Sequence, residues 1–286
     1  MKIFFILSFT LNLFSYTLSS TYYIDSKNIK LQHLIPHAKY NITLYKIDKN
    51  NHTKKIKAQT ILTLLKQHGF KNIKTSGRYI KFIEKSPIYL DSMKSSIKKY
   101  YKEKYLNIII SSLTIIPRRY IQNLPHSYEL KLQKNAYLKK SGIFSIKTLN
   151  NKRIYFDFFL DAMVEVYETR TPIKKGERIS LLNTKRKYIK LDKFRALPIN
   201  TTHLNKTQVK RNTKINSILN LRDIETLNLV KKGAHVSVRL NNNNISISFS
   251  AKALQNGKLR DIITIQKNDK KRLKVKVVGH NQVEIQ

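Results

Sequence analysis

A train of short alternating segments, separated by Gly and Asn, occupies residues 229–286 of the chain. Apolar side chains stand at every second position in four stretches, which are 236–240, 245–249, 263–265 and 273–277. A period of two gives each strand one buried face. Residues that tolerate the positive φ of tight turns flank or separate the stretches, namely Gly233, the Asn run 241–244, Gly257 and Gly279. The pattern predicts a small all-β domain at the C-terminal end.

The order of these turns resembles the C-terminal end of the flagellar P-ring assembly chaperones. Three segments carry the resemblance: VKKGAHVSVRL at 230–240, SAKALQNGKLRDIITIQKND at 250–269 and KRLKVKVVGHNQVEI at 271–285. In that family's middle segment an Ala-Leu pair precedes a Gly-containing spacer, an Asp and an apolar strand that ends in Asn. The matching positions here are Ala253, Leu254, Gly257, Asp261 and Asn268, and Gly233 is the motif residue of the first segment. Arg260 is a departure, because the family usually has a second Gly just before the Asp.

A second resemblance lies upstream, in VEVYETRTPIKKGERIS at 164–180. This segment looks like the start of a SAF domain, a β-clip module found in these chaperones, some sugar-acid synthases, and pilus and antifreeze proteins. Gly176 and Glu177 occupy the turn that leads into a long excursion, here 185–193. Residues 216–229 resemble the closing strand, with Asn residues where the family has a Gly-rich turn.

The first 20 residues have the layout of a secretory leader, with one Lys, an apolar run and small residues at Ser19 and Ser20. The apolar run is interrupted by polar residues and falls short of the ~20 residues that span a bilayer. We therefore predict cleavage near Ser19 or Ser20 and export to the periplasm, the alternative being an uncleaved anchor. The chain has no Cys, which excludes lipid attachment through Cys, disulfides and thiol chemistry.

The region between the leader and the SAF-like segment alternates between strand and helix patterns. Strands are predicted at 41–47 and 79–83, a helix at 58–67 between them, and a longer helix at 92–105. Two further strands are expected, at 107–116 and 128–132. The fold class is therefore mainly β with an α+β N-terminal domain. The predicted organisation is a leader at 1–20, an α+β domain at 21–155, a SAF-like β-clip domain at 156–228 and a β domain at 229–286.

The formal net charge is +39, from 56 Lys and Arg against 17 Asp and Glu. Such a charge suits nucleic acid, because cations that neutralise phosphates release counterions. The basic residues are spread along the whole chain and are mostly Lys, whereas Arg is better suited to forked recognition of phosphate. We interpret the charge as a solvated surface and expect no nucleic-acid partner. The alternative is an acidic partner: a protein face, anionic lipid or an envelope polymer.

A search for catalytic or metal-binding patterns finds two weak pairs. His33 and His37 have helical spacing, but Pro36 lies between them, and Asp157 and Asp161 stand within an apolar stretch without a third polar partner. Phosphate-binding Gly loops, nucleophile elbows and Cys/His pairs do not occur. We predict no enzyme, no metal and no cofactor.

The resemblance implies a periplasmic chaperone that assists assembly of the flagellar basal-body P ring by binding its subunits. Strand addition is the expected mode of binding, since it relies on main-chain hydrogen bonds. The predicted contact residues are Ile245, Ile247 and Phe249. Two other interpretations are a periplasmic SAF-domain protein of pilus assembly and a basic protein that binds envelope polymer or lipid surfaces. No stable membrane insertion is expected once the leader is removed.

Overall fold

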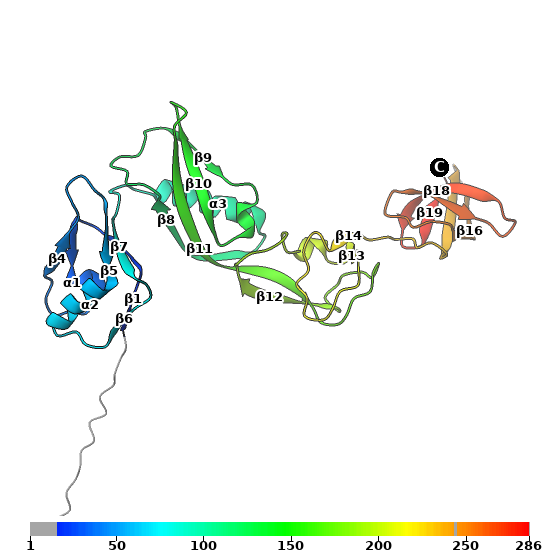
Figure 1. The fold of residues 1–286 in the computed structure, drawn as a ribbon. Coiled ribbons are helices and arrows are strands. Elements are labelled where there is room, and N and C mark those ends of the chain that lie inside the picture. Colours follow the sequence, from blue (N-terminus) through cyan, green and yellow to red (C-terminus); the bar gives the residue numbers. More distant parts are fainter. Residues whose placement is uncertain (1–15, 243–244, 286) are drawn as a thin grey trace, which may run out of the picture. The chain divides into compact units, whose positions relative to one another are not determined.

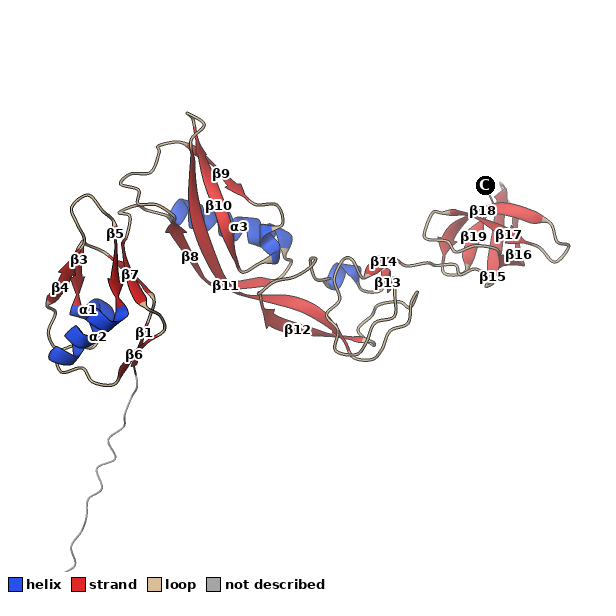
Figure 2. Ribbon diagram, viewed as in Figure 1, coloured by secondary structure: helices blue, strands red, loops and turns tan. Residues whose placement is uncertain are grey.

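The computed structural model describes residues 16–242 and 245–285 (Figure 1). The chain divides into two compact units. The first comprises 1–90, 116–130 and 145–156, and the second comprises 91–115, 131–144 and 157–286. Strands predominate among the described residues, which confirms the predicted fold class (Figure 2).

The N-terminal part of the first unit is α+β, as the alternation of patterns predicts. Its helices are α1 (Leu31–Leu34) and α2 (Ala58–Gln67), and α2 covers the predicted helix. Helix α2 turns Ile61 and Leu65 into the core and ends before Gly69, which has a φ of +88°. The strands form three small sheets: β1 (Tyr16–Leu18) with β6 (Ile73–Thr75), β3 (Asn28–Lys30) with β4 (Thr43–Lys46), and β2 (Thr21–Ile24), β7 (Tyr79–Glu84) and β5 (Thr53–Lys57) in the order β2-β7-β5.

Strand β1 lies within the segment that the sequence assigns to the leader. It pairs in parallel with β6, and Leu18 is 1% exposed in the same core as Ile24 and Phe82. Removal of residues 1–20 would take away this strand and a core side chain. The predicted leader boundary at Ser20 therefore falls inside the folded part of the chain.

A five-stranded sheet follows, in the order β12-β11-β10-β9, with β8 paired to β11. Strand β11 runs unbroken through the predicted domain boundary at 155, because the segment contains no Gly or Pro to interrupt it. The members of the sheet are β8 (Ile108–Pro117), β9 (Tyr128–Leu132), β10 (Ser141–Thr148), β11 (Arg153–Thr169) and β12 (Thr184–Lys190).

Helix α3 (Asp91–Lys104) belongs to the second unit and buries Met93, Ile97 and Tyr101. The Tyr101 hydroxyl lies 2.9 Å from the Ala136 carbonyl oxygen and 2.7 Å from that of Lys139, so it joins the helix to η1 (Ala136–Leu138). Burial raises the pKa of Tyr101 well above its ordinary value, so the hydroxyl keeps its proton.

The SAF-like region is built mainly of turns around a compact apolar cluster. It contains η2 (Thr201–His203) and the paired strands β13 (Thr207–Val209) and β14 (Ile224–Thr226). Isolated bridges, such as Ile173 to Thr213 and Arg178 to Gln208, connect its turns. The cluster consists of Tyr167, Ile173, Ile179, Ile199, Val209, Leu219 and Ile224.

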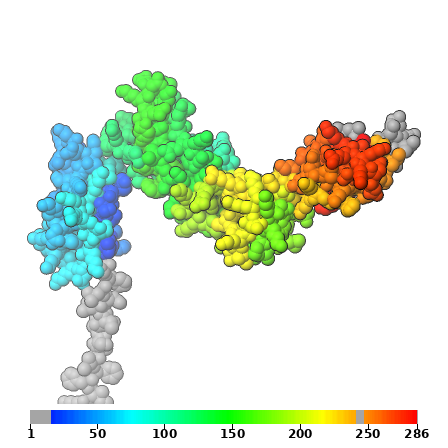
Figure 3. Space-filling view, turned by 45° about the vertical axis from the view of Figure 1, so that its right-hand side comes forward, coloured from blue at the N-terminus to red at the C-terminus, as the bar shows by residue number. Residues whose placement is uncertain are grey.

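The C-terminal segment, for which the alternating pattern predicts a small β domain, forms a closed barrel in the order β15-β16-β17-β18-β19 (Figure 2). The strands are β15 (His235–Asn242), β16 (Ile245–Ala253), β17 (Ile262–Gln266), β18 (Arg272–Gly279) and β19 (Gln282–Glu284). The inward positions are those of the period-two pattern, among them Val236, Val238, Ile263, Ile265, Val275 and Val277. In the space-filling view the residues of the barrel are coloured orange to red (Figure 3).

The described residues include no helix that is both long and apolar enough to cross a membrane.

Candidate functional site

Gly257, one of the motif residues, is buried in the wall of the barrel. A Cβ at this position would lie 2.7 Å from Ile263 Cγ2 and 2.7 Å from Val277 Cγ2. Its backbone also joins the barrel to the preceding segment: its N–H donates to Val230 O at 2.9 Å, and its carbonyl accepts from Leu229 N at 2.8 Å. The position therefore requires Gly because of close packing.

Arg260 and Asp261 form the turn that enters β17. Arg260 has a φ of +70°, in the left-handed region that Gly adopts without penalty. The Asp261 side chain accepts a hydrogen bond from Lys258 N at 2.9 Å, and Arg260 N donates to Val277 O at 2.8 Å. The backbone conformation explains the Gly that the family has at this position, and Arg260 adopts it with strain.

Replacing Arg260 by Gly should raise the stability of the barrel. A non-Gly residue in the left-handed region costs about 1 kcal/mol, part of which is offset by the greater freedom of Gly in the unfolded chain. We expect a net gain of about 0.5 kcal/mol in the free energy of unfolding, measured by urea denaturation. Lys258→Gly is the matched control, since Lys258 does not have a positive φ, and it should destabilise. A loss of stability in Arg260→Gly would contradict this interpretation.

The remaining motif residues also serve local geometry. Gly233 has a φ of +87° and donates its N–H to Ala253 O at 2.8 Å, while Ala253 is 1% exposed and Leu254 N donates to Thr264 O. Gly176 has a φ of +75° and donates to Val209 O at 2.9 Å. The Glu177 carboxylate accepts the Lys174 N–H at 3.0 Å and closes the same turn. Gly176 and Glu177 shape the SAF-like turn, and the others shape the barrel.

The predicted contact segment lies on a strand edge that has no partner. Strand β16 pairs with β15 over its length, from the pair Ile245–Asn242 to the pair Lys252–His235. Its pairing with β17 involves only two residues, Lys252 and Ala253. Among the residues that the structure describes, no strand pairs with the other edge of β16 before Lys252. We name residues 247–250 the open edge. The backbone of Ile245 belongs to β16, but its side chain lies outside the described part of the chain.

The side chains of the open edge are apolar on the core side. Phe249 pairs with Val238, which is fully buried, and packs partly into the barrel core. Ile247 shares that face, two residues along, yet is 50% exposed because β17 does not extend this far. The core-facing side of β16 is thus left partly uncovered where its edge is unpaired.

The open edge is uncharged in a chain with a net charge of +39. Residues 240–251, LNNNNISISFSA, include no Lys, Arg, Asp or Glu. Charged groups lie beside it on neighbouring strands: Arg239 of β15 pairs with Ser248, and the ammonium of Lys267 lies 5.0 Å from the centre of the Phe249 ring. Charged side chains are a common means by which edge strands resist pairing. The open edge lacks this protection, so it can accept another strand.

Strand β12 is a second edge strand, but it is protected. It carries Lys185, Arg186 and Lys187, which point toward two carboxylates on β11. Lys185 Nζ lies 3.0 Å and Lys187 Nζ 3.7 Å from Glu168, and Arg186 lies 4.0 Å from Glu165. The hydrogen bond from Lys185 holds the pKa of the Glu168 carboxyl below its ordinary value. The charges of β12 thus serve the β11–β12 hairpin.

Acid should weaken this hairpin through Glu168. Because the folded-state pKa of Glu168 is lowered, its contribution to stability is present above its ordinary pKa of 4.5 and is lost as pH falls through the folded value. The difference in urea midpoint between the parent chain and Glu168→Gln should be largest near pH 7 and shrink below pH 4.5. Asp192→Asn is the control, because the Asp192–Lys140 ion pair is largely exposed and contributes little. A difference that stays constant with pH would contradict the role of Glu168.

The two candidate pairs from the sequence, His33 with His37 and Asp157 with Asp161, do not belong to a metal site in the described part of the chain. His33 Nδ1 accepts the Lys30 N–H at 3.0 Å, so this ring caps α1. Asp157 lies on β11 with its side chain half-buried, and Asp161 is exposed farther along the strand. Within the described ranges, no group of three His, Asp or Glu side chains is arranged to hold a metal ion.

Comparison with known proteins agrees with this architecture. Residues 164–285 match the family described as chaperone for flagella basal body P-ring formation. The chain is similar to Salmonella FlgA in open form, with 14% identity, a TM-score of 0.50, and coverage of 68% of this chain and 92% of the other. It is also similar to the flagellar protein FlgA from Thermotoga maritima, with 14% identity, a TM-score of 0.45, and coverage of 95% and 100%. No match is found among curated proteins.

The small barrel, with a strand edge that is partly unpaired and uncharged, is the feature of this fold best suited to binding another strand. Residues 164–285 are similar to the family of chaperones for flagella basal body P-ring formation. The sequence resemblance drawn from the turns of the barrel is thereby confirmed.

Proposed function

We propose that this chain is a non-catalytic periplasmic chaperone that binds the P-ring subunit along the open edge of β16. The match to the P-ring chaperone family over 164–285 supports the client, and this range includes the whole barrel. The single observation that supports the contact surface is that residues 247–250 of β16 pair with β15 but not with β17, whose pairing begins at Lys252. Strand addition would satisfy the free main-chain groups and cover Ile247.

Binding by the chaperone would protect the client, the P-ring subunit, before it assembles. A ring subunit that has not yet assembled exposes strand edges and apolar surface, which pair prematurely with other copies. An uncharged strand that offers its own edge covers such a surface reversibly. The chaperone needs no catalytic group for this task.

The direct test is capture of the purified P-ring subunit by the purified chain, combined with deletion of the gene. We expect binding that survives 0.5 M NaCl, because burial of apolar surface is little affected by screening, and loss of P rings in the deletion strain. Normal P rings without the gene would refute the proposal. Binding that disappears at moderate salt would instead favour attraction between the charge of +39 and an anionic polymer or lipid surface.

If the chain is exported, the structure predicts where its leader is cleaved. Because Leu18 is buried and β1 pairs with β6, we expect the exported chain to begin at or before Tyr16. Mass spectrometry of the protein recovered from the periplasm gives the N-terminal residue. A mature chain that begins at Ser20 or Thr21 would show that β1 is not part of the working protein.

A further inference from the structure

A cavity of about 640 Å³ lies in the first unit, outside the residues that match the chaperone family. Two segments far apart in the sequence line it: the end of β8 with the residues after it, and the start of β11. We name it the Arg–Tyr pocket, and its lining residues are Arg118, Arg119, Tyr120, Ile121, Arg153, Ile154 and Tyr155.

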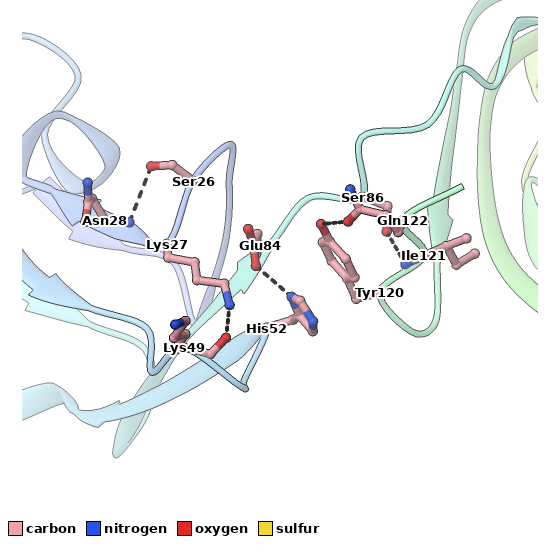
Figure 4. Close-up of polar contacts among 10 residues, drawn as sticks. All are labelled: Ser26, Lys27, Asn28, Lys49, His52, Glu84, Ser86, Tyr120, Ile121 and Gln122. Carbon is pink, nitrogen blue, oxygen red and sulfur yellow. Dashed lines mark hydrogen bonds and ion pairs between the residues drawn. The ribbon is translucent and has the colours of Figure 1, made fainter. Parts of the chain in front are cut away.

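Main-chain and side-chain contacts hold the walls of the Arg–Tyr pocket in place. Arg118 N donates to Tyr155 O at 3.0 Å and joins the two segments. Ile121 N donates to Ser86 Oγ at 2.9 Å, and the Tyr120 hydroxyl donates to Gln122 Oε1 at 2.8 Å (Figure 4). These hydrogen bonds join the two lining segments to each other and to Ser86.

The Tyr120 ring is fixed further by His52. The two rings stack with their centres 3.6 Å apart and an angle of 5° between their planes. His52 Nδ1 in turn lies 2.7 Å from Glu84 Oε2, so the ring that stacks on Tyr120 is itself held by a carboxylate (Figure 4). One face of Tyr120 is consequently occupied by protein. Glu84 is engaged by His52 and is not among the lining residues.

The lining has an excess of positive charge. It includes three guanidinium groups and no carboxylate. Arg119 and Arg153 are exposed, and the described part of the chain provides neither with an ion pair. The guanidinium fork matches the geometry of a carboxylate, while the two Ile and the two Tyr rings offer apolar surface beside it.

We propose that the Arg–Tyr pocket binds a short acidic segment of a partner protein. Carboxylates of the segment pair with Arg119 and Arg153, and a neighbouring apolar or aromatic side chain packs on Ile154 and Tyr155. Nucleic acid fits less well, because stacked bases need free aromatic faces and one face of Tyr120 already lies on His52. This contact is separate from the open edge and does not depend on the identity of the client.

The test uses the purified chain and a fluorescein-labelled peptide, Glu-Glu-Tyr-Glu-Glu, in a fluorescence anisotropy titration at 0.15 M NaCl. The peptide Gln-Gln-Tyr-Gln-Gln, titrated in the same way, measures the affinity that remains without carboxylates. We expect the double variant Arg119→Ala/Arg153→Ala to bind the acidic peptide about tenfold more weakly or worse. The matched control Arg195→Ala/Arg222→Ala removes the same formal charge from exposed positions elsewhere and should change affinity less than about twofold.

Circular dichroism of both double variants confirms that they fold, which is expected since all four side chains are exposed. Amide NMR shifts on addition of the acidic peptide should be concentrated at 118–121 and 153–155. Equal weakening in the two double variants would overturn the proposal, since binding would then reflect only the general field of the chain. Unlabelled hexathymidylate that displaces the peptide more effectively than unlabelled Glu-Glu-Tyr-Glu-Glu would overturn it in favour of nucleic acid.

Discussion

Replacing Gly257 by Ala is expected to lower the free energy of unfolding of the barrel by about 3 kcal/mol, the upper part of the range for overpacked cores. The added Cβ would stand 2.7 Å from methyl groups of Ile263 and of Val277. Both are branched side chains in the core, so neither can move aside without disturbing its neighbours. The measurement is urea denaturation of the full chain, with hydrogen exchange at Val236 and Val275 to identify the barrel as the part that opens.

Gly233→Ala is the control for this substitution. Gly233 also belongs to the motif and has a φ of +87°, but a Cβ added there would meet no described atom within 4 Å. Only backbone strain of about 1 kcal/mol is expected at this position. If both variants lose the same stability, backbone conformation and not close packing explains the requirement for Gly at 257.

Replacing Ser248 by Pro is expected to weaken binding of the P-ring subunit at least about tenfold, since it removes a main-chain donor from the open edge. Alternate residues of an antiparallel strand direct their N–H groups to opposite edges. Ala253 N donates to Ala234 O on the β15 side, so Ala251 and Phe249 also face β15, and Ser248 directs its N–H to the other edge. Pro is tolerated at such a position, and the barrel should keep its fold.

Ser248→Ala is the matched control, because it changes the same side chain and keeps the N–H. Its affinity for the P-ring subunit, measured by calorimetry, should stay within about twofold of the parent chain. Ile247→Asp gives an independent check, as a carboxylate on the half-exposed core side opposes burial by a client strand. Undiminished binding in Ser248→Pro with an intact barrel would exclude strand addition at this edge.

The two edge strands show how a highly basic chain distributes its charge. On β12 the cations are paired with Glu165 and Glu168, and the edge is protected. On β16 the open edge carries neither a cation nor a carboxylate. The net charge of +39 keeps the surface solvated while a short neutral stretch is left for pairing.

Several features of the fold could be predicted from the residues alone. The period-two pattern indicates the inward face of each barrel strand, since Val236, Val238, Val275 and Val277 are all buried. The apolar spacing of Ile61 and Leu65, ended by Gly69, predicts α2 with its observed limits. Gly257 and Asp261 indicate the family, because the turns they form place strict demands on residue type.

Other features were not accessible in this way. The sequence places Leu18 in an apolar leader, and its burial depends on the pairing of β1 with β6, far along the chain. The Arg–Tyr pocket unites 118–121 with 153–155, and no spacing rule links them. Two adjacent Arg residues in a Lys-rich chain were the available signal, but a charge run is usually only a solvated face.

The amino-acid sequence by itself determined the strand faces, the turns that need Gly or Asn, and through them the resemblance of residues 164–285 to the chaperone family. Tertiary structure decided which edge of β16 is left without a partner and which Arg residues meet in one cavity. The physical reason is that alternation of apolar residues reports burial, a property of each residue and its near neighbours. Pairing between strands and the convergence of side chains depend on distant segments, and these positions become defined when the chain folds.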